Sequence, residues 1–411
     1  MNRRAVITGL GTVNPLSSNV DDFWQRLLNG ESGISTVSRF DTSAYKVHFG
    51  GEVKDFLPES RIDGKIAKRM DRFAQFAMIS ALDAVADSGL NFDQESRDRC
   101  AVILGSGTGG MEVFEEESIK HQQSGPGRVS PFFIPKLMSN AAPAAVSIHF
   151  GLRGVALSVA TACASAADAI AMSLDAIRAG RADVILSGGS EAALTPLGVA
   201  GFCAAKALST RNDSPQTACR PFDRDRDGFV LGEGAGVIVI EEMEHAKKRG
   251  AKIYCELLGA GQSSDAYHIT APHPEGEGAT LSMEKALIDA RLNATDVQYV
   301  NTHATSTPLG DQAETKAIHQ AFGSHSSRLV VSSTKSMIGH LCGASGGVAA
   351  IVCALTIQNN MVHPTINYEN PDPACDLDCV PNTARSYHVN HALATSFGFG
   401  GHNCSLVFGR C

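Results

Sequence analysis

The amino-acid sequence predicts a layered α/β fold. Short runs rich in β-branched residues alternate with longer alanine-rich segments along the whole chain, as strands and helices do in such folds. Hydrophobic residues make up 43% and charged residues 19%, a balance that fills a large core and argues against disorder. Gly occurs 40 times and aromatic residues are only 6%, which favours close backbone packing and many tight turns.

Two halves are expected within the 411 residues. The best boundary is the charged helical run from Glu241 to Lys252, which separates two apolar segments with the composition of strands. We therefore expect an N-terminal half over residues 1–250 and a C-terminal half over residues 251–411.

The two halves also repeat the same order of elements. A strand, a turn and a helix of small residues occur around Cys163 and again around His340. We interpret this repetition as a weak internal duplication. It would bring Cys163 and His340 to matching helix N-termini near a shared centre.

Charge and cysteine content argue against several classes of protein. The net charge of -8 is spread along the chain, so no basic stripe for nucleic acid is present. The eleven Cys residues include no Cys-x-x-Cys pair, no His-x-x-x-His spacing occurs, and we expect no metal site. An odd Cys count in a chain of this size indicates reduced thiols in the cytoplasm.

Only one segment resembles a membrane span. The residues from Ile338 to Ile357 lack Asp, Glu, Lys and Arg over 20 positions, which is long enough to cross a bilayer. Because this stretch begins with a glycine-rich turn and lacks charged flanks, we expect a buried helix and no membrane partner. The start of the chain lacks the apolar stretch of a signal peptide.

Cys163 is the candidate nucleophile. In SVATACASAA a short strand enters a tight turn and then a helix of small residues, so the side chain would be exposed at a strained turn. The helix N-terminus there would favour a thiolate. The alternative is an inert core cysteine, which we expect for the other ten.

Two histidines are candidates for catalysis. His303 follows a strand in NTHATST, and His340 ends STKSMIGH, so each lies at a strand-to-helix turn among hydroxyl side chains or glycine. Near the C-terminus, glycines flank an aromatic residue in TSFGFGGHN, which would leave backbone N–H groups free to face an oxyanion.

Two other motifs are incomplete, because each lacks a residue that its function requires. The run Asp223-x-Asp225-x-Asp227-Gly228 begins like a calcium loop, but its twelfth position is Gly234 instead of Glu, so we expect a structural loop with its arginines. The glycines of GSGTGG match a dinucleotide fingerprint without the acidic residue that should follow.

Together these motifs resemble the β-ketoacyl-acyl-carrier-protein synthases. The resemblance rests on TACASA, NTHATSTPLGD, STKSMIGH, SFGFGGHN and the run PFDRDRDGFVLGEGAG from Pro221, and it covers essentially the whole chain. It implies a thiolase-like fold, with two pseudo-symmetric halves in a five-layered α-β-α-β-α arrangement, and a homodimer. It also implies an acyltransferase that elongates fatty acids by decarboxylative condensation.

The resemblance implies roles for individual residues. Cys163 would take an acyl group from the phosphopantetheine of an acyl carrier protein, and no cofactor would be bound by the enzyme itself. The N–H groups of Cys163 and Phe399 would form the oxyanion hole. His303 and His340 would stabilise the enolate formed from malonyl carrier, and Lys335 would orient them and add positive potential.

It further implies residues for substrate and partner. Thr305 and Thr307 would hydrogen-bond the pantetheine arm, which Phe399 would gate. The acyl pocket would be lined by Thr108, Phe133 and Phe202. An acidic carrier needs a local basic patch, for which the sequence offers Lys65, Lys68, Arg69 and Arg72, and the resemblance adds Lys206.

The sequence departs from the family pattern at two positions. Ala349 stands where members commonly have a Glu near Lys335, so Glu314 could pair with Lys335 instead. Thr108 stands where many members have Ile, and its hydroxyl is expected to bond a backbone carbonyl.

Other functions remain possible. A polyketide ketosynthase would carry the same three residues. A non-catalytic partner subunit would lack Cys163. A thiolase would act on coenzyme A esters and use a second Cys in place of one His, and a cysteine hydrolase would show its own signature.

Overall fold

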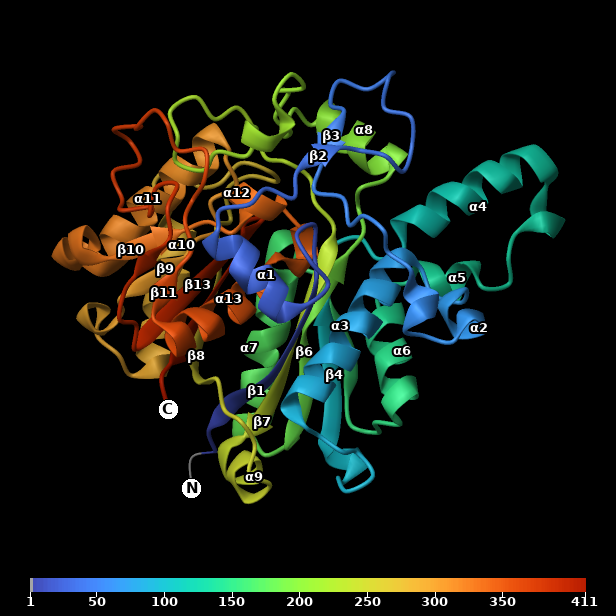
Figure 1. The fold of residues 1–411 in the computed structure, drawn as a ribbon, viewed down its shortest axis with the longest axis horizontal. Helices are drawn as coiled ribbons and strands as arrows, with labels where there is room; N and C mark the ends of the chain where they lie inside the picture. Colours follow the sequence, from blue (N-terminus) through green and yellow to red (C-terminus); the bar gives the residue numbers. More distant parts are fainter. Residues whose placement is uncertain (1–2) are drawn as a thin grey trace.

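The computed structural model describes residues 3–411 (Figure 1). Met1 and Asn2, the first residues of the expected N-terminal half, lie outside this range. The strands are β1 (Ala5–Val13), β2 (Ser35–Thr36), β3 (Phe49–Gly50), β4 (Cys100–Gly105), β5 (Ala156–Val159), β6 (Val184–Glu191), β7 (Gly234–Glu242), β8 (Cys255–Ser264), β9 (Tyr299–Asn301), β10 (Val330–Ser332), β11 (Met361–Val362), β12 (Arg385–Ser386), β13 (His391–Gly398) and β14 (His402–Gly409). The helices are α1 (Val20–Leu28), α2 (Gly64–Ala67), α3 (Arg72–Ser88), α4 (Met111–Ser124), α5 (Phe133–Leu137), α6 (Ala141–Phe150), α7 (Ser165–Arg178), α8 (Pro196–Ala204), α9 (Met243–Lys248), α10 (Glu277–Ala290), α11 (Pro308–Phe322), α12 (Lys335–Ile338) and α13 (Ser345–Asn359).

Ten strands form one mixed sheet in the order β10-β9-β13-β14-β8-β1-β7-β6-β4-β5. When the strands of each half are counted along the chain, both halves have the order 3-2-4-5-1. In both, the first three strands of this order run parallel and the fifth strand of the half runs antiparallel to the fourth. The expected internal duplication is therefore present in the topology.

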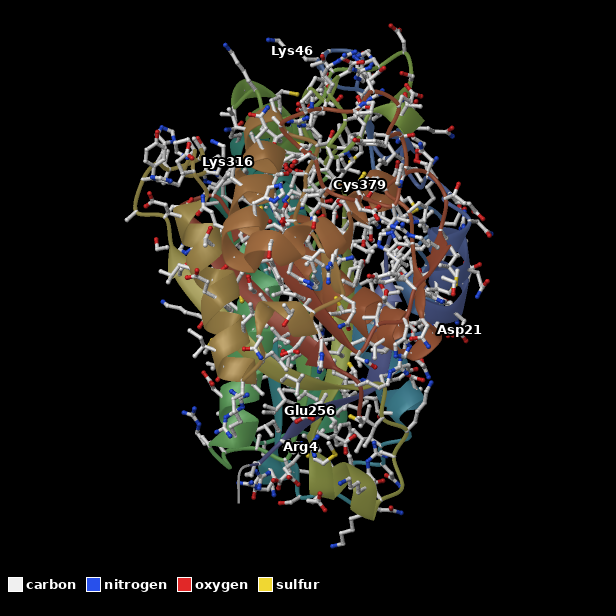
Figure 2. The ribbon with its side chains drawn as sticks, turned by 90° about the vertical axis from the view of Figure 1, so that its left-hand side faces the viewer. Arg4, Asp21, Lys46, Glu256, Lys316 and Cys379 are labelled. Atoms are coloured by element: carbon white, nitrogen blue, oxygen red, sulfur yellow. The ribbon has the colours of Figure 1, made fainter. Side chains whose placement is uncertain are left out.

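The halves meet through their first strands. Ala5, Val6 and Ile7 of β1 pair antiparallel with Leu257, Glu256 and Cys255 of β8. Next to this short pairing, the Arg4 guanidinium donates two hydrogen bonds to the Glu256 carboxylate. Figure 2 shows this pair close together near one end of the molecule. The junction thus combines backbone pairing with an ion pair.

Five layers result, as expected (Figure 1). Helix α3 packs on β1 and β7 and forms one outer layer with α6, while α10 packs on β8 and β14 and forms the other with α11. Helices α7 and α13 lie between the two halves of the sheet and contact both of them. Alanines on α7 are buried against neighbouring strands, so small side chains let the layers approach closely.

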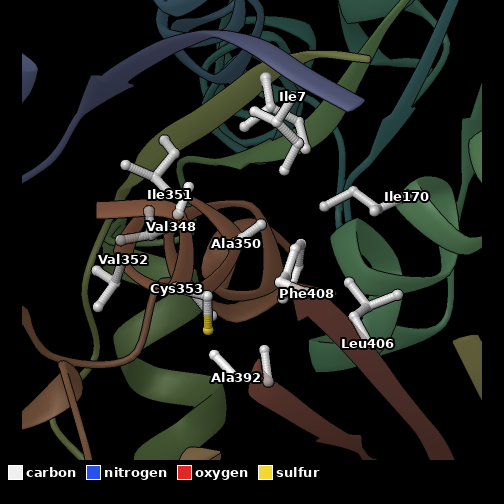
Figure 3. Packing of buried hydrophobic residues seen from close by; sticks show 14 of the residues in the cluster. Ile7, Ile170, Val348, Ala350, Ile351, Val352, Cys353, Ala392, Leu406 and Phe408 are labelled. Atoms are coloured by element: carbon white, nitrogen blue, oxygen red, sulfur yellow. The ribbon is translucent and has the colours of Figure 1, made fainter. Parts of the chain in front are cut away.

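The core is centred on α13. Figure 3 shows Val348, Ala350 and Cys353 of this helix among apolar side chains from both halves, including Ile7 and Phe408. The helical stretch Cys342–Asn359 is long and apolar enough to cross a membrane by composition, but 89% of it is buried inside the protein. The expectation of a buried core helix is confirmed.

Candidate active site

The candidate residues follow strands that run parallel to a neighbour. Cys163 follows β5, His303 follows β9, Lys335 follows β10 and Phe399 follows β13. Because carboxyl ends of parallel strands share one edge of a sheet, segments far apart in sequence meet there. The duplicated halves thus supply one site together.

A strained turn presents Cys163. After β5 the chain enters the 3₁₀ turn Ala162–Ala164, in which Ala162 has a φ of 50°, and α7 then begins at Ser165. The Ser165 hydroxyl accepts from the Thr161 N–H and donates to the Ala162 carbonyl, which holds the turn closed. A left-handed non-glycine residue beside a reactive side chain is typical of functional turns.

The second half repeats this turn. The 3₁₀ turn Cys342–Ala344 precedes α13, and Cys342 has a φ of 43°. The position equivalent to Cys163 is therefore Gly343, and His340 lies three residues earlier. A Cβ on Gly343 would lie 2.4 Å from the Gly107 backbone nitrogen, so this turn has no room for a side chain. The duplication brings the Cys163 turn and the His340 segment together, as expected. The two reactive side chains do not occupy equivalent positions, because the second turn has Gly343 where the first has Cys163.

Cys163 and His340 are in direct contact. Cys163 Sγ lies 2.9 Å from His340 Nε2, and His340 Nδ1 lies 3.0 Å from Ser345 Oγ at the start of α13. The rings of His303 and His340 are nearly perpendicular, with centroids 5.3 Å apart. One ligand-type atom from each of Cys163, His303 and His340 lies within 4.8 Å of the others. These three side chains converge on a single reacting position.

Burial dominates the ionisation of these groups. It raises the pKa of the Cys163 thiol to about 12, although Lys335 and the backbone N–H groups of Phe399 and Cys163 favour the thiolate. Burial, with the positive charge of Lys335, lowers the pKa of both His303 and His340 well below the ordinary range. Burial therefore favours the thiol of Cys163 and the neutral imidazole of His340. The sequence-based expectation of a thiolate at the helix N-terminus is outweighed by desolvation.

Two backbone N–H groups favour a negative charge on the nucleophile. The amides of Phe399 and Cys163 both lower the pKa of the Cys163 thiol, against the larger opposing effect of burial. The loop after β13 reaches this position because residue 398 is glycine: a Cβ there would lie 2.7 Å from the Thr161 carbonyl oxygen and 3.1 Å from the Cys163 nitrogen. Paired amides at one point have the geometry needed to bind an oxyanion.

The Glu314 carboxylate accepts hydrogen bonds from backbone N–H groups instead of forming an ion pair with Lys335. It accepts from the His303 N–H at 2.9 Å, the Ala304 N–H at 2.6 Å and the Thr395 hydroxyl at 2.7 Å. Within residues 3–411 no hydrogen bond or salt bridge joins it to Lys335, so that expected pair is wrong. Burial raises the pKa of Glu314 to about 7 and lowers that of Lys335, while Glu314 favours the lysine's charged form. Ala349 packs in the apolar core.

The expected substrate residues lie in different settings. Thr305 is buried and its hydroxyl lies 3.1 Å from that of Thr307. Phe202 meets Phe229 edge-on, and Phe229 meets the His340 ring in the same way, each with centroids 5.4 Å apart. One aromatic ring thus separates Phe202 from the His340 imidazole. Phe133, at the start of α5, is partly buried.

Thr108 is exposed, and its hydroxyl donates to Glu191 Oε1 at 2.7 Å. The expected bond to a backbone carbonyl is therefore wrong. Glu191 is fully buried at the end of β6 and was not singled out from the sequence. It also accepts from Ser106 Oγ and from the N–H groups of Gly107, Thr108 and Gly343. The available signal was a single carboxylate at the end of the strand VILSGGSE.

The basic residues split into two groups. Lys65, Lys68 and Arg69 are exposed on and just after α2. Arg72, in contrast, donates two hydrogen bonds to the buried Glu233 carboxylate, so it is not a free member of the patch. Lys206 is exposed just after α8, which lies apart from α2 in Figure 1.

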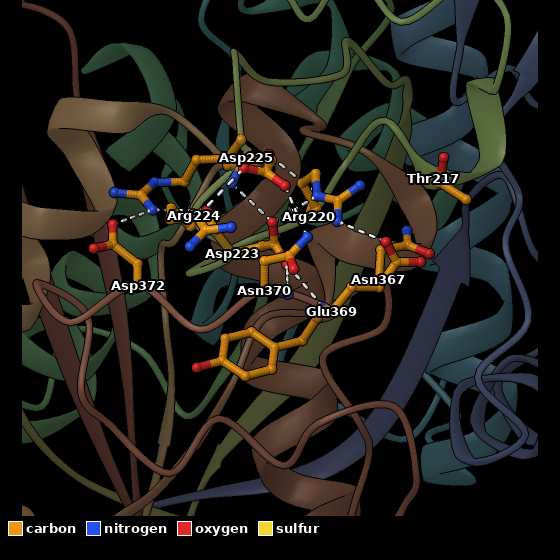
Figure 4. A network of polar contacts seen from close by, with 12 residues as sticks. Thr217, Arg220, Asp223, Arg224, Asp225, Asn367, Glu369, Asn370 and Asp372 are labelled. Carbon is orange, nitrogen blue, oxygen red and sulfur yellow. Dashed lines mark hydrogen bonds and ion pairs between the residues drawn. The ribbon is translucent and has the colours of Figure 1, made fainter.

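The calcium-like run is a structural loop, as expected. The Asp223 carboxylate accepts from the Arg220 guanidinium and from the N–H groups of Asp225, Glu369 and Asn370 (Figure 4). Arg226 donates to Asp372. The Asn370 amide donates to the Asp225 carboxylate and the Thr210 N–H donates to that of Asp227, so all three aspartates of the run hold partners within the loop.

Known proteins share both sequence and fold with this chain. "3-oxoacyl-[acyl-carrier-protein] synthase 2" of Staphylococcus aureus is 50% identical over 407 residues, covering 99% of this chain and 98% of the relative. The protein of the same name from Synechocystis is 48% identical over 406 residues, with the same coverage.

Solved structures agree over the full length. A β-ketoacyl synthase from Burkholderia phymatum has a TM-score of 0.93 at 35% identity. A ketosynthase of a type II polyketide system, solved with its acyl-carrier protein and bound to the hexaketide, has a TM-score of 0.93 at 33% identity. Each covers 100% of both chains.

The family models complete the comparison. "Beta-ketoacyl synthase, N-terminal domain" matches residues 2–246, and "Beta-ketoacyl synthase, C-terminal domain" matches residues 254–369. The thiolase-like fold class is confirmed by the structural neighbours. The chain belongs to the β-ketoacyl synthase family.

Proposed function

We propose that the protein catalyses the reaction of a 3-oxoacyl-[acyl-carrier-protein] synthase II. It joins an acyl chain held on Cys163 to malonyl-[acyl-carrier-protein] with loss of CO₂ and so elongates fatty acids by two carbons. The observation that carries this is the 2.9 Å contact between Cys163 Sγ and His340 Nε2 with His303 alongside, in a chain about half identical to enzymes of that name.

Acyl loading begins with Cys163. Its sulfur attacks the thioester carbonyl of the acyl carrier while the thiol proton moves to His340 Nε2. The oxygen's negative charge is stabilised by the N–H groups of Cys163 and Phe399. The carbon–sulfur bond to the carrier then breaks, and the departing pantetheine thiolate takes the proton from His340.

Condensation follows with malonyl carrier. Its carboxylate leaves as CO₂ and the electron pair forms an enolate, whose oxygen accepts hydrogen bonds from His303 and His340. Lys335 orients these rings and adds positive potential. The enolate carbon attacks the acyl-enzyme carbonyl, the bond to Cys163 breaks, and β-ketoacyl carrier is released. The Cys163 thiolate then takes a proton from solvent, which restores the thiol.

Ser345 suits both steps. A hydroxyl can donate or accept, so it supports His340 with its single proton on either ring nitrogen. His340 can therefore act as an acceptor toward the thiol and as a donor toward the enolate.

Thr305 and Thr307 bind the pantetheine arm, and Phe399 gates it, while Thr108, Phe133 and Phe202 line the acyl pocket.

The partner is an acyl carrier protein, and the enzyme itself uses no bound cofactor and no metal. Carrier docking is assigned to Lys65, Lys68, Arg69 and Lys206, because an acidic carrier needs a basic surface on an enzyme of net charge -8. All eleven cysteines are free, which supports a cytoplasmic location.

The proposal includes a homodimer in which each protomer consists of two similar halves. The halves are residues 1–250 and 251–411, supported by their identical strand orders. Strand β5 is one edge of the sheet, and Val155 and Leu157 there are exposed, with 52% and 40% of their surface accessible. A second copy covering this edge removes both the unpaired backbone and the apolar surface from water.

A polyketide ketosynthase is the second candidate, favoured by the full-length likeness to the ketosynthase bound to the hexaketide. The deciding experiment mixes purified enzyme with acyl carrier and malonyl carrier, without reducing enzymes, and identifies products by mass spectrometry. A single two-carbon extension supports fatty acid elongation. Repeated extension supports the polyketide function, and no extension contradicts both.

A further inference from the structure

A closed ring of buried polar side chains lies beneath two of the catalytic turns. It consists of Tyr299 and Asn301 on β9, Ser332 at the end of β10, Thr334, and His363 just after β11. None is more than 5% exposed. Such a network is costly to bury unless every member is paired, so its arrangement is well determined.

The proton positions in this ring follow from one fixed contact. His363 Nδ1 lies 2.9 Å from the Pro364 carbonyl oxygen, which can only accept a hydrogen bond, so Nδ1 carries the proton. Burial lowers the pKa of His363 to about 4, which keeps the ring neutral. His363 Nε2 therefore carries a lone pair and acts only as an acceptor.

Two chains of hydrogen bonds end on that lone pair. In one, the Asn301 amide donates to Tyr299 at 2.9 Å, Tyr299 lies 2.8 Å from Ser332 Oγ, and Ser332 Oγ lies 3.2 Å from His363 Nε2. In the other, Asn301 donates to Thr334 Oγ1 at 3.0 Å, which lies 3.0 Å from His363 Nε2. Asn301 is the common donor and His363 the common acceptor.

Two members of the ring, Asn301 and Thr334, lie close in sequence to proposed catalytic residues. Asn301 is two residues before His303, and Thr334 immediately precedes Lys335. Further bonds tie the same two segments, because Ser333 Oγ donates to the Ala304 carbonyl at 2.7 Å and the Thr302 N–H donates to the Ser332 carbonyl at 3.0 Å. The ring does not include Cys163 or His340.

We propose that His363 is a positioning residue, which fixes the His303 turn relative to the Lys335 turn by accepting both hydrogen-bond chains at Nε2. The inference rests on the proposed function, since it concerns the step that uses His303 and Lys335. Its consequence is selective: decarboxylation of malonyl carrier depends on the ring, whereas acyl loading of Cys163 does not. A displacement of about 1 Å at a reacting group can change a rate by about 100-fold.

The test compares His363→Gln with His363→Leu. Gln can place an acceptor oxygen near the position of Nε2, while Leu cannot. Each variant is assayed for acyl loading by intact-protein mass spectrometry and for CO₂ release from malonyl carrier. We expect His363→Leu to lower decarboxylation kcat about 10- to 100-fold with loading within about threefold of wild type, and His363→Gln to recover most of the loss. His325→Leu, which removes a histidine bonded to the Val297 carbonyl away from this ring, is the matched control.

Equal losses in loading and decarboxylation, or no difference between Gln and Leu, would overturn the inference. If His363→Leu does not fold, Thr334→Val removes one chain with little change in shape and should show the same selective loss. Failure of the proposed function is a separate result: wild-type enzyme would then neither load acyl groups on Cys163 nor release CO₂.

Discussion

The Thr108 hydroxyl donates a 2.7 Å hydrogen bond to the buried Glu191 carboxylate, whose other oxygen accepts from the Gly343 N–H three residues after His340. The loop that carries Thr108 and the turn that precedes α13 are therefore held by one side chain. A change at Thr108 should be felt both in pocket shape and in stability.

Thr108→Phe should shorten the pocket. The larger ring cannot keep the bond to Glu191, and if residue 108 lines the acyl channel it blocks the space beyond it. We expect kcat/KM to fall for long acyl chains and to change little for short ones, measured across a series of acyl carriers. Thr108→Val, similar in shape but unable to donate, is the control and should cost about 1 kcal/mol of stability. A uniform fall at every chain length would show that residue 108 does not measure the chain.

His303 and His340 should differ in acyl loading. Only His340 is bonded to Cys163, so His340→Ala should slow loading as well as condensation, whereas His303→Ala should spare loading and lower condensation by about 100-fold or more. The measurement is the rate of acyl-enzyme formation from acyl carrier alone, followed by the rate of product formation. Identical behaviour of the two variants would contradict this division of labour.

The rate at which Cys163 is alkylated should rise with pH without levelling off near neutral pH. Because burial raises the pKa of the Cys163 thiol to about 12, the rate with iodoacetamide should keep rising between pH 6 and about pH 10. Ser345→Ala, which removes the partner of His340 Nδ1, should leave that slope in place. A plateau starting near neutral pH would instead indicate a thiolate–imidazolium ion pair.

His245 should make the stability of the fold depend on pH in the alkaline range. His245 lies 2.9 Å from both Glu241 and Glu95, and these contacts raise its pKa from 6.5 to about 9. A raised pKa in the folded state means that its contribution is complete below about pH 6.5 and is lost as the pH rises through 9. We expect the Tm difference between wild type and His245→Gln to shrink over that interval. Lys247→Gln, at an exposed pair on the same helix, should show no such trend.

Charge reversal should separate the two groups of basic residues. Lys65→Glu with Arg69→Glu should raise KM for carrier-bound substrate several-fold while sparing small thioester mimics, since both side chains are exposed on the same surface. Lys316→Glu, on the exposed face of α11, serves as the control. Arg72→Glu should instead lower Tm, because it removes the guanidinium that donates two hydrogen bonds to the buried Glu233 carboxylate and places a second carboxylate beside it. Unchanged KM in the double variant would remove α2 from the docking surface.

The sequence predicted the positions of the candidate residues better than it predicted their environment. Cys163, His303 and His340 stand at strand-to-helix turns that small residues and hydroxyls mark clearly, and the fold brings them together at parallel strand ends. The ionisation of Cys163 could not be predicted in the same way. The helix N-terminus is visible in a local pattern, whereas desolvation depends on how completely distant segments bury the thiol.

The errors have a common physical cause. The Lys335–Glu314 pair and the inclusion of Arg72 in the basic patch were both inferred from charge alone. In the fold, Glu314 accepts backbone N–H groups and Arg72 accompanies a buried carboxylate 161 residues away. Neither a carboxylate's choice of backbone N–H groups nor a partner far away along the chain can be read from the spacing of charges. Glu191 was overlooked for the same reason, because its donors come from two separate turns.

The most direct test of the account is the fate of the acyl group. Purified protein is mixed with acyl carrier, its intact mass is measured, and the modified residue is located by peptide mapping, with Cys163→Ser as the control. Malonyl carrier is then added. We expect one acyl group on Cys163 that disappears as β-ketoacyl carrier forms, and neither event in Cys163→Ser. An acyl group on another residue, or β-ketoacyl carrier formed by Cys163→Ser at the wild-type rate, would contradict it.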